Sequence, residues 1–207
     1  MSTPSAPKSP ARRLLTADMA RRVPWKNGRG STLELVTDAA PGAPWSWRLA
    51  LADVPEAAPF SSFPGIDRVI AVLCGGGLTL RGTDGVREVP RVGEGLAFAG
   101  EEAILGEPRG PGVRDANLML TRGAWRGGLH LCRAGEHIAS GDVVVVHAAG
   151  GTVAVVDGAG ALTLGTGETL VTTGEVRVRP ASGEGCAVVA HFRRGILSPS
   201  NPTPLSA

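Results

Sequence analysis

Residues 72–85 read VLCGGGLTLRGTDG, and residues 155–167 read VVDGAGALTLGTG. Both stretches contain an apolar pair, a glycine turn, the triplet Leu-Thr-Leu and a Gly-Thr turn, and both are followed by a Gly-Glu turn, at 93–94 and 174–175. The two copies lie about 82 residues apart, which is a spacing typical of an internal repeat. We therefore predict two similar β-rich halves.

Short apolar runs continue this pattern outside the repeat, at 33–36, 47–51, 69–73, 78–80, 143–146, 153–156, 162–164 and 187–190. The 207 residues include 30 Gly and 16 Pro, well above the usual combined share of about 12%. Short strands joined by tight turns favour an antiparallel sandwich or barrel. Helical composition is confined to Thr16–Arg22, where we expect about two turns that end at Val23-Pro24.

Composition excludes several classes of protein. With 43% hydrophobic and 19% charged residues the chain is not disordered, and it lacks the ~18 uninterrupted apolar residues of a membrane helix. Residues 1–11 resemble no secretory signal and are expected to form a disordered leader, with the cytoplasm as the compartment. Cys74, Cys132 and Cys186 form no CxxC, so we expect reduced, buried thiols rather than disulfides or a zinc ribbon.

Positive charge gathers at the start of the chain. The net charge is +2, but residues 1–30 contain seven Lys or Arg and one acidic residue, Asp18. No lysine-rich face or repeated aromatic platform follows, so nucleic-acid binding is not expected. Docking of this basic segment on an acidic protein partner stays an alternative.

The histidines do not match the usual metal-binding pattern of cupins. That pattern places two histidines one residue apart on a strand, and His130, His137, His147 and His191 form no HxH. Were His130 and His137 on one strand, their side chains would point to opposite faces. We therefore expect neither a metal nor another cofactor.

Polar residues of the first half concentrate in four short clusters, PWKNG (24–28), WR (47–48), FSSFPGIDR (60–68) and RDANLM (114–119). Each cluster also has a purely structural interpretation: Asn-Gly forms turns, tryptophan fills cores, and neighbouring Asp and Arg form surface ion pairs. The combination carries more information than any one cluster.

These clusters lie in longer stretches that resemble the HutD/Ves family of bicupins, namely PWKNGRGSTLEL (24–35), WRLALADV (47–54), PFSSFPGIDRVIAVLCGGGLTL (59–80) and RDANLMLTRG (114–123). The resemblance implies an all-β bicupin, with two jelly-roll barrels in one compact chain and minimal helix. It also implies a metal-free protein that binds a small acidic metabolite of histidine utilisation, such as a formylglutamate-like or urocanate-like compound. The expected divisions are a leader (1–11), a first half with the pocket (12–123), a structural second half (124–197) and a tail (198–207).

Three positions depart from the family pattern. The family tends to have glycine at Arg29, arginine at Leu33 and an aromatic residue at Ala116. Leu33 removes a basic group and Ala116 removes a bulky side chain, so the ligand need not be the same across the family. Arg29 could compensate for the missing basic group at 33.

The clusters provide the groups that a carboxylate site needs. Arginine forks bind carboxylates in bidentate fashion, lysine adds a mobile cation, and tryptophan forms an apolar wall, as Trp47 could. The predicted ligand-binding residues are Trp25, Lys26, Asn27, Arg48, Ser61, Asp67, Arg68 and Asn117.

No complete catalytic constellation is evident, because the histidines lie outside the clusters and Ser61 has no activating base. The rival hypothesis is a metal-free isomerase or hydrolase of a small carboxylate, with Asp67, Asp115 or Glu34 as base and Lys26 or an arginine as electrophile. An exposed edge strand of a jelly roll would allow a homodimer.

Overall fold

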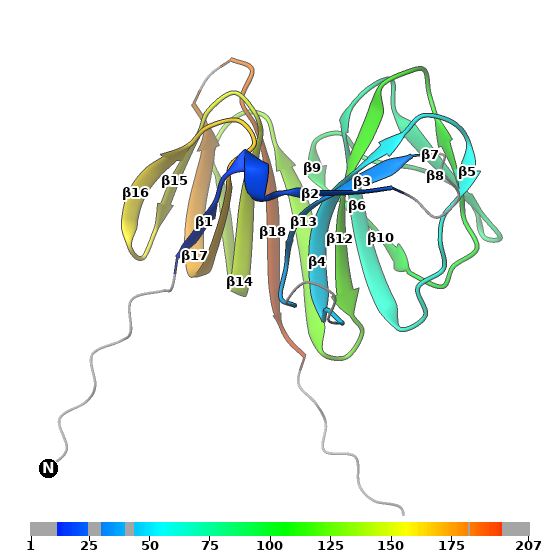
Figure 1. The fold of residues 1–207 in the computed structure, drawn as a ribbon, viewed down its shortest axis with the longest axis horizontal. Coiled ribbons are helices and arrows are strands. Elements are labelled where there is room, and N and C mark those ends of the chain that lie inside the picture. The colour runs from blue at the N-terminus through cyan, green and yellow to red at the C-terminus, as the bar shows by residue number, and fades with distance from the viewer. Residues whose placement is uncertain (1–11, 25–29, 40–43, 182, 196–207) are drawn as a thin grey trace, which may run out of the picture.

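The computed structural model describes residues 12–24, 30–39, 44–181 and 183–195. Within these ranges the chain is all β apart from one short 3-10 helix, and every ladder between named strands is antiparallel. Figure 1 shows two β-rich halves side by side, joined by strands that run through the centre of the molecule. All eight apolar runs predicted from the sequence lie in strands.

The first half is built around a six-stranded sheet. Its order is β10 (Leu96–Ala99), β6 (Ile66–Cys74), β12 (Val113–Thr121), β4 (Trp47–Val54), β3 (Ser31–Thr37) and β2 (Arg21–Pro24). Strands β6, β12 and β4 are buried at most positions, because both of their faces are covered. Pro24 ends β2, which lies at the sheet edge where a missing N–H is tolerated.

A four-stranded sheet faces the six-stranded sheet and completes the first half. Its order is β5 (Ala58–Pro59), β11 (Leu105–Pro108), β7 (Leu78–Gly82) and β8 (Gly85–Glu88). Buried side chains from both sheets, including Ile70, Val72, Leu78 and Leu80, form a common cluster between them. The first half is therefore a sandwich of two sheets.

The second half is one eight-stranded sheet. Its order is β16 (Gly160–Leu164), β15 (Val153–Asp157), β17 (Thr169–Pro180), β14 (His137–Gly150), β18 (Cys186–Arg194), β13 (Trp125–Cys132) and β9 (Gly93–Glu94), with β1 (Arg13–Leu15) paired to β17. Six of these strands contribute to one aliphatic cluster, so the sheet curves around it. Strands β1 and β9 come from the segment assigned to the first half, and they tie the two halves together.

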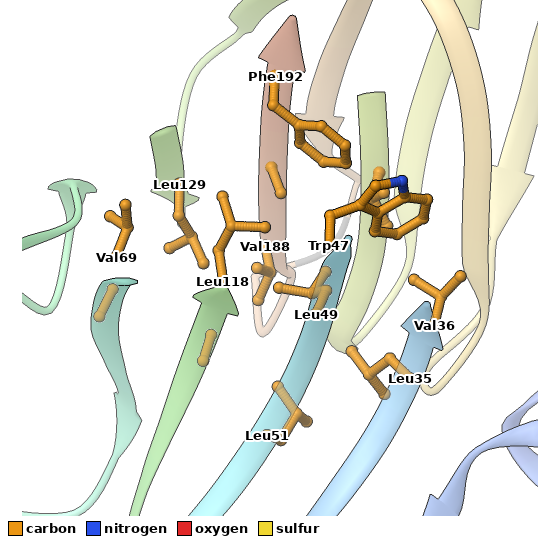
Figure 2. Packing of buried hydrophobic residues seen from close by; sticks show 14 of the residues in the cluster. Leu35, Val36, Trp47, Leu49, Leu51, Val69, Leu118, Leu129, Val188 and Phe192 are labelled. Carbon is orange, nitrogen blue, oxygen red and sulfur yellow. The ribbon is translucent and has the colours of Figure 1, made fainter. Parts of the chain in front are cut away.

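A third core cluster lies between the halves. It joins side chains of the six-stranded sheet, such as Leu49 and Leu118, to side chains of β13 and β18, such as Leu129 and Phe192. Figure 2 shows these side chains meeting between the strands, with Trp47 beside Phe192 at a ring-centroid distance of 5.0 Å. One face of the six-stranded sheet therefore packs on the second half, and its other face turns toward the four-stranded sheet.

The repeated sequence forms similar local structures with different pairing. In each copy a glycine turn joins two strands, β6 to β7 and β15 to β16. Strands β15 and β16 pair with each other, whereas β6 and β7 belong to different sheets. Gly75 in the first turn has φ 87°, and a Cβ there would lie 2.7 Å from Val113, so glycine is required for this crossing between sheets.

Two local predictions are wrong. The helix expected over Thr16–Arg22 is only a 3-10 turn, η1 (Ala17–Met19), because residues from Arg21 onward pair as β2 with β3. Cys132 and Cys186 are buried as expected, but Cys74 is exposed at the end of β6; all three are free. Among the described residues, no helix is long and apolar enough to cross a membrane.

Candidate functional site

A cavity of about 400 Å³ opens in the first half, between the six-stranded sheet and the segment 59–63. Its sheet wall consists of alternate residues of β4 and β12 together with Arg68 of β6, and strands β2 and β3 close one side. Ala50 and Ala52 lie on this wall, and their small side chains leave the space that larger residues would fill. The cavity has the size of a small-molecule site.

Strand register arranges the polar side chains of this wall in order. Met119 pairs with Arg48 on one side and with Arg68 on the other, so the two arginines flank it across three strands. Asn117 and Asp115 follow on the same face of β12, because successive side chains of a strand alternate between faces. Arg48 and Arg68 therefore lie beside Met119 on the wall. The amide of Asn117 comes next along β12, and the carboxyl of Asp115 follows it.

Arg68 is the most unusual group of the site. Its side chain is buried, and its guanidinium carbon lies 4.9 Å from the ring centroid of Phe60, 5.0 Å from Phe98 and 5.8 Å from Phe63. Among the described residues it forms no ion pair, and its Nε has no hydrogen-bond partner. Burial lowers the pKa of Arg68 to about 10, and Arg48 adds to the fall while Asp115 opposes it. Three aromatic rings surround the cation.

Asp115 and Asn117 also have unsatisfied polar atoms. Asp115 is 1% exposed, and neither its Oδ1 nor the Oδ1 of Asn117 has a hydrogen-bond partner within the described ranges. Burial raises the pKa of Asp115 to about 7, a rise that Asp53 assists and Arg68 opposes. Unpaired buried polar atoms are costly and therefore rare, so several around one cavity indicate a ligand or bound water.

Arg48 differs from Arg68 in having a counter-charge. Its Nε lies 3.0 Å from Glu34 Oε2, which makes an ion pair, although this N–H has no hydrogen-bond partner among the described residues. Burial lowers the pKa of Arg48, an effect that Glu34 opposes and Arg21 assists. The Arg48–Glu34 pair is close to neutral, which leaves Arg68 as the uncompensated cation of the wall.

The structure brings four of the predicted site residues together: Arg48, Ser61, Arg68 and Asn117 all line the cavity. Trp25, Lys26 and Asn27 lie outside the described residues, as does Arg29.

Asp67 and Trp47 do not line the cavity. Both precede a cavity-lining arginine on a strand, so their side chains point to the opposite face. Asp67 Oδ1 accepts a hydrogen bond from Arg122 Nε at 2.7 Å, and Trp47 packs in the cluster between the halves. Asp67 therefore does not brace Arg68, and Trp47 is not a wall of this cavity.

Two departures from the family pattern also lie away from the cavity. Ala116 belongs to the cluster between the halves, and Leu33 packs against the same cluster. An aromatic residue at 116 would change the packing of the halves rather than the lining of the cavity.

Sequence reasoning missed the aromatic cage and the position of Asp115. The three phenylalanines come from the segment 59–63 and from β10, and only the pair in FSSF was part of a noted cluster. The sequence indicates Asp115 as a candidate base or as an ion-pair partner of an arginine, and not as a ligand-binding residue. The signal that could have revealed it is its spacing of two residues from Asn117, which puts both on one strand face.

The second half contains a separate group of histidines. His130 and His137 lie on different strands, β13 and β14, and their rings stack at a centroid distance of 3.7 Å. His130 Nδ1 lies 3.0 Å from Glu94 Oε1. No group of three or more His, Cys, Asp or Glu in the described part of the chain is arranged to hold a metal ion.

Three of the four arginines between residues 12 and 22 form ion pairs. Arg12 binds Asp157, Arg21 lies 3.4 Å from Glu34, and Arg22 lies 3.1 Å from Asp53. These contacts attach the segment to both halves, so its charge is partly used within the molecule.

Comparison with known proteins agrees with this fold. The chain is 38% identical over 115 residues to an uncharacterized 21.2 kDa protein in the hutC 3′ region of Pseudomonas putida, a match that covers 55% of this chain and 60% of that protein. It is 32% identical over 136 residues to protein Ves of Cronobacter sakazakii, covering 65% and 71%. The structure of HutD from Pseudomonas fluorescens SBW25, described as a formate condition, superposes with a TM-score of 0.72 at 28% identity, covering 89% and 99%.

The prediction of an all-β bicupin with minimal helix is confirmed by the strands and by these structural relatives. The HutD family model matches residues 17–190, which include both halves and every described wall of the cavity. The chain belongs to the HutD family.

Proposed function

We propose that this chain binds a small carboxylate-bearing metabolite in the cavity of its first half, and that it has a regulatory or accessory role in histidine or amino-acid catabolism. The observation that carries the binding proposal is Arg68, a buried guanidinium on the cavity wall without a counter-ion among the described residues. An isolated buried charge costs several kcal/mol, and an anionic ligand would compensate it.

The rest of the wall fits such a ligand. Arginine forks hold carboxylates through parallel hydrogen bonds, and Asn117 and Ser61 offer further neutral partners. The role in catabolism is supported by the family, and by the printed location of the P. putida relative in the hutC 3′ region.

The experiment is a thermal-shift and calorimetric screen of formate, acetate, glutamate, formylglutamate and urocanate at millimolar concentration. We expect at least one of them to stabilise the wild-type protein. Arg68→Lys should weaken binding by about tenfold or more and leave the fold intact, because an ammonium cannot reproduce the planar fork. Arg81→Lys is the matched control, since Arg81 pairs with Glu107 on the surface of the four-stranded sheet. Absence of stabilisation by every acid would contradict the proposal.

One observation favours a second candidate, a metal-free isomerase or hydrolase. The pKa of Asp115 is raised to about 7 by burial, and this carboxyl lines the cavity, as a general acid or base would. Turnover of a carboxylate from the same screen, lost in Asp115→Asn with binding retained, would support this candidate. Binding without turnover favours a role limited to recognition.

A further inference from the structure

We propose that Asp115 takes up a proton when the cavity binds an anion, so that the site admits one negative charge only while this carboxyl is neutral. The inference rests on the proposed function, and it adds how binding at that site is regulated.

The charged side chains at the cavity wall come from different strands. Strand β6 presents Arg68, strand β4 presents Arg48 and β12 presents Asp115, while Glu34 of β3 lies outside the lining and pairs with Arg48. Glu34 lies 3.0 Å from Arg48 and also 3.4 Å from the exposed Arg21. Together, the charges of Arg68, Arg48, Glu34 and Asp115 sum to zero when Asp115 is ionised, and to a single positive charge when Asp115 is protonated.

The other charged groups around the wall lie outside the cavity lining, where Arg21 contacts Glu34 and two arginines contact Asp53. Asp53 raises the pKa of Asp115, but it is itself paired with Arg22 and Arg114. On the opposite sheet, Arg87 approaches Phe98 at 5.9 Å and pairs with Glu102 at 2.6 Å. The segment 59–63 contributes only neutral side chains.

Geometry makes the ionised state of Asp115 incompatible with an anion. The carboxyl is 1% exposed, its Oδ1 has no hydrogen-bond partner among the described residues, and Arg68 is the cation of the wall whose charge acts on it. A ligand carboxylate on Arg68 would share that one cation with a second buried negative charge. Two carboxylates in one buried site cannot both stay ionised, so one of them holds a proton. The protonated Asp115 then offers an O–H donor to the ligand or to Asn117.

Formate is a suitable probe because a carboxylic acid with a pKa near 4 stays ionised between pH 6 and pH 8. Half-protonation of Asp115 near pH 7 in the free protein predicts formate binding about tenfold weaker at pH 8 than at pH 6. Isothermal titration calorimetry in buffers of different ionisation enthalpy should show uptake of about nine tenths of a proton per formate at pH 8 and about one tenth at pH 6.

Two variants make the test specific. Asp115→Asn mimics the neutral carboxyl, so it should bind formate at pH 8 as tightly as the wild type does at pH 6, with no dependence on pH. Asp67→Asn is the matched control, because Asp67 lies on the other face of the sheet and pairs with Arg122. It should retain the wild-type pH dependence.

The outcomes separate the two proposals. Formate binding that is independent of pH in the wild type, or equally pH-dependent in Asp115→Asn, overturns proton coupling and leaves carboxylate binding intact. No formate binding by either protein between pH 6 and pH 8, together with a negative acid screen, overturns both. Should Asp115→Asn fail to fold, the proton count of the wild type decides the question alone.

Discussion

The buried polar groups of the two halves differ in whether they have partners. In the second half His147 Nδ1 lies 2.9 Å from Thr169 Oγ1, and Thr172 donates a hydrogen bond to Asp157 at 2.8 Å. In the first half Arg68, Asp115 and Asn117 each have a buried polar atom without a partner among the described residues. Two histidine nitrogens, on His137 and His191, are exceptions in the second half.

This difference indicates that the two halves have different roles, stability in the second half and binding in the first. Satisfied polar groups stabilise a fold modestly, whereas unsatisfied ones destabilise it unless a ligand supplies the missing partner. The second half therefore has an interior typical of a structural domain, and the first half has one typical of a binding site. Both halves share the core cluster between them, which raises the question of whether they unfold as one unit.

The largest expected effect concerns that shared cluster. Phe192→Ala removes a fully buried ring that contacts Trp47 at 5.0 Å and Trp125 at 5.4 Å, and it should lower the free energy of unfolding by about 4 kcal/mol. Because the ring packs on strands of both halves, a single unfolding transition should move to lower urea concentration. Two separate transitions would show that the halves fold independently.

The next effect is the pH dependence of the second half. Burial lowers the pKa of His147 to about 4, below its ordinary value of 6.5, so the unfolded chain binds the proton more tightly. Stability from this group is present above pH 6.5 and is lost as the pH falls toward 4, by about 3 kcal/mol at most. Urea unfolding of the wild type and of His147→Gln between pH 4 and pH 7 checks this, since the variant should have a shallower slope. Parallel slopes would contradict it.

A matched pair of substitutions gives the smallest and most direct comparison. Asp157→Asn breaks a charged contact with Arg12 and should lower stability at pH 8 by about 2 kcal/mol. Asp115→Asn removes a buried carboxyl whose folded pKa lies above its ordinary value, so it should raise stability at pH 8, in the opposite direction to Asp157→Asn. Urea midpoints measured at one pH suffice, and shifts of the same sign would refute the contrast between the halves.

The pKa of Asp115 explains why Asp115→Asn should increase the free energy of unfolding at pH 8. The native state holds this proton up to about pH 7, whereas the unfolded chain releases it near pH 3.8. Stability from the neutral carboxyl is therefore lost as the pH rises between these values. The gain from Asp115→Asn should accordingly vanish near pH 4, which provides an internal control.

The strands could be predicted from the sequence because their apolar runs are long and bounded by glycine. The site could be predicted only in part, because β6 and β4 are buried on both faces. Their sequences therefore lack the alternation of polar and apolar residues that would show which side chains face the cavity. In a half-exposed strand, polar residues would have shown which of Asp67 and Arg68 faces inward. Here Val69 and Ile70 are equally apolar, so the sequence does not show which of them lies on the cavity face of the sheet. Packing between the halves decides this, and with it the direction of the Asp67 and Arg68 side chains. The contact of Phe98 with Arg68 depends on the ladder between β10 and β6, which no local pattern encodes.

Strand β12 alternates between two environments along its length, with Asp115, Asn117 and Met119 on the cavity and Ala116, Leu118 and Leu120 in the cluster between the halves. A one-residue insertion or deletion in this strand would exchange the two sets and abolish recognition and assembly together. Point substitutions at the even positions would, in contrast, change the packing between the halves and leave the binding surface unchanged.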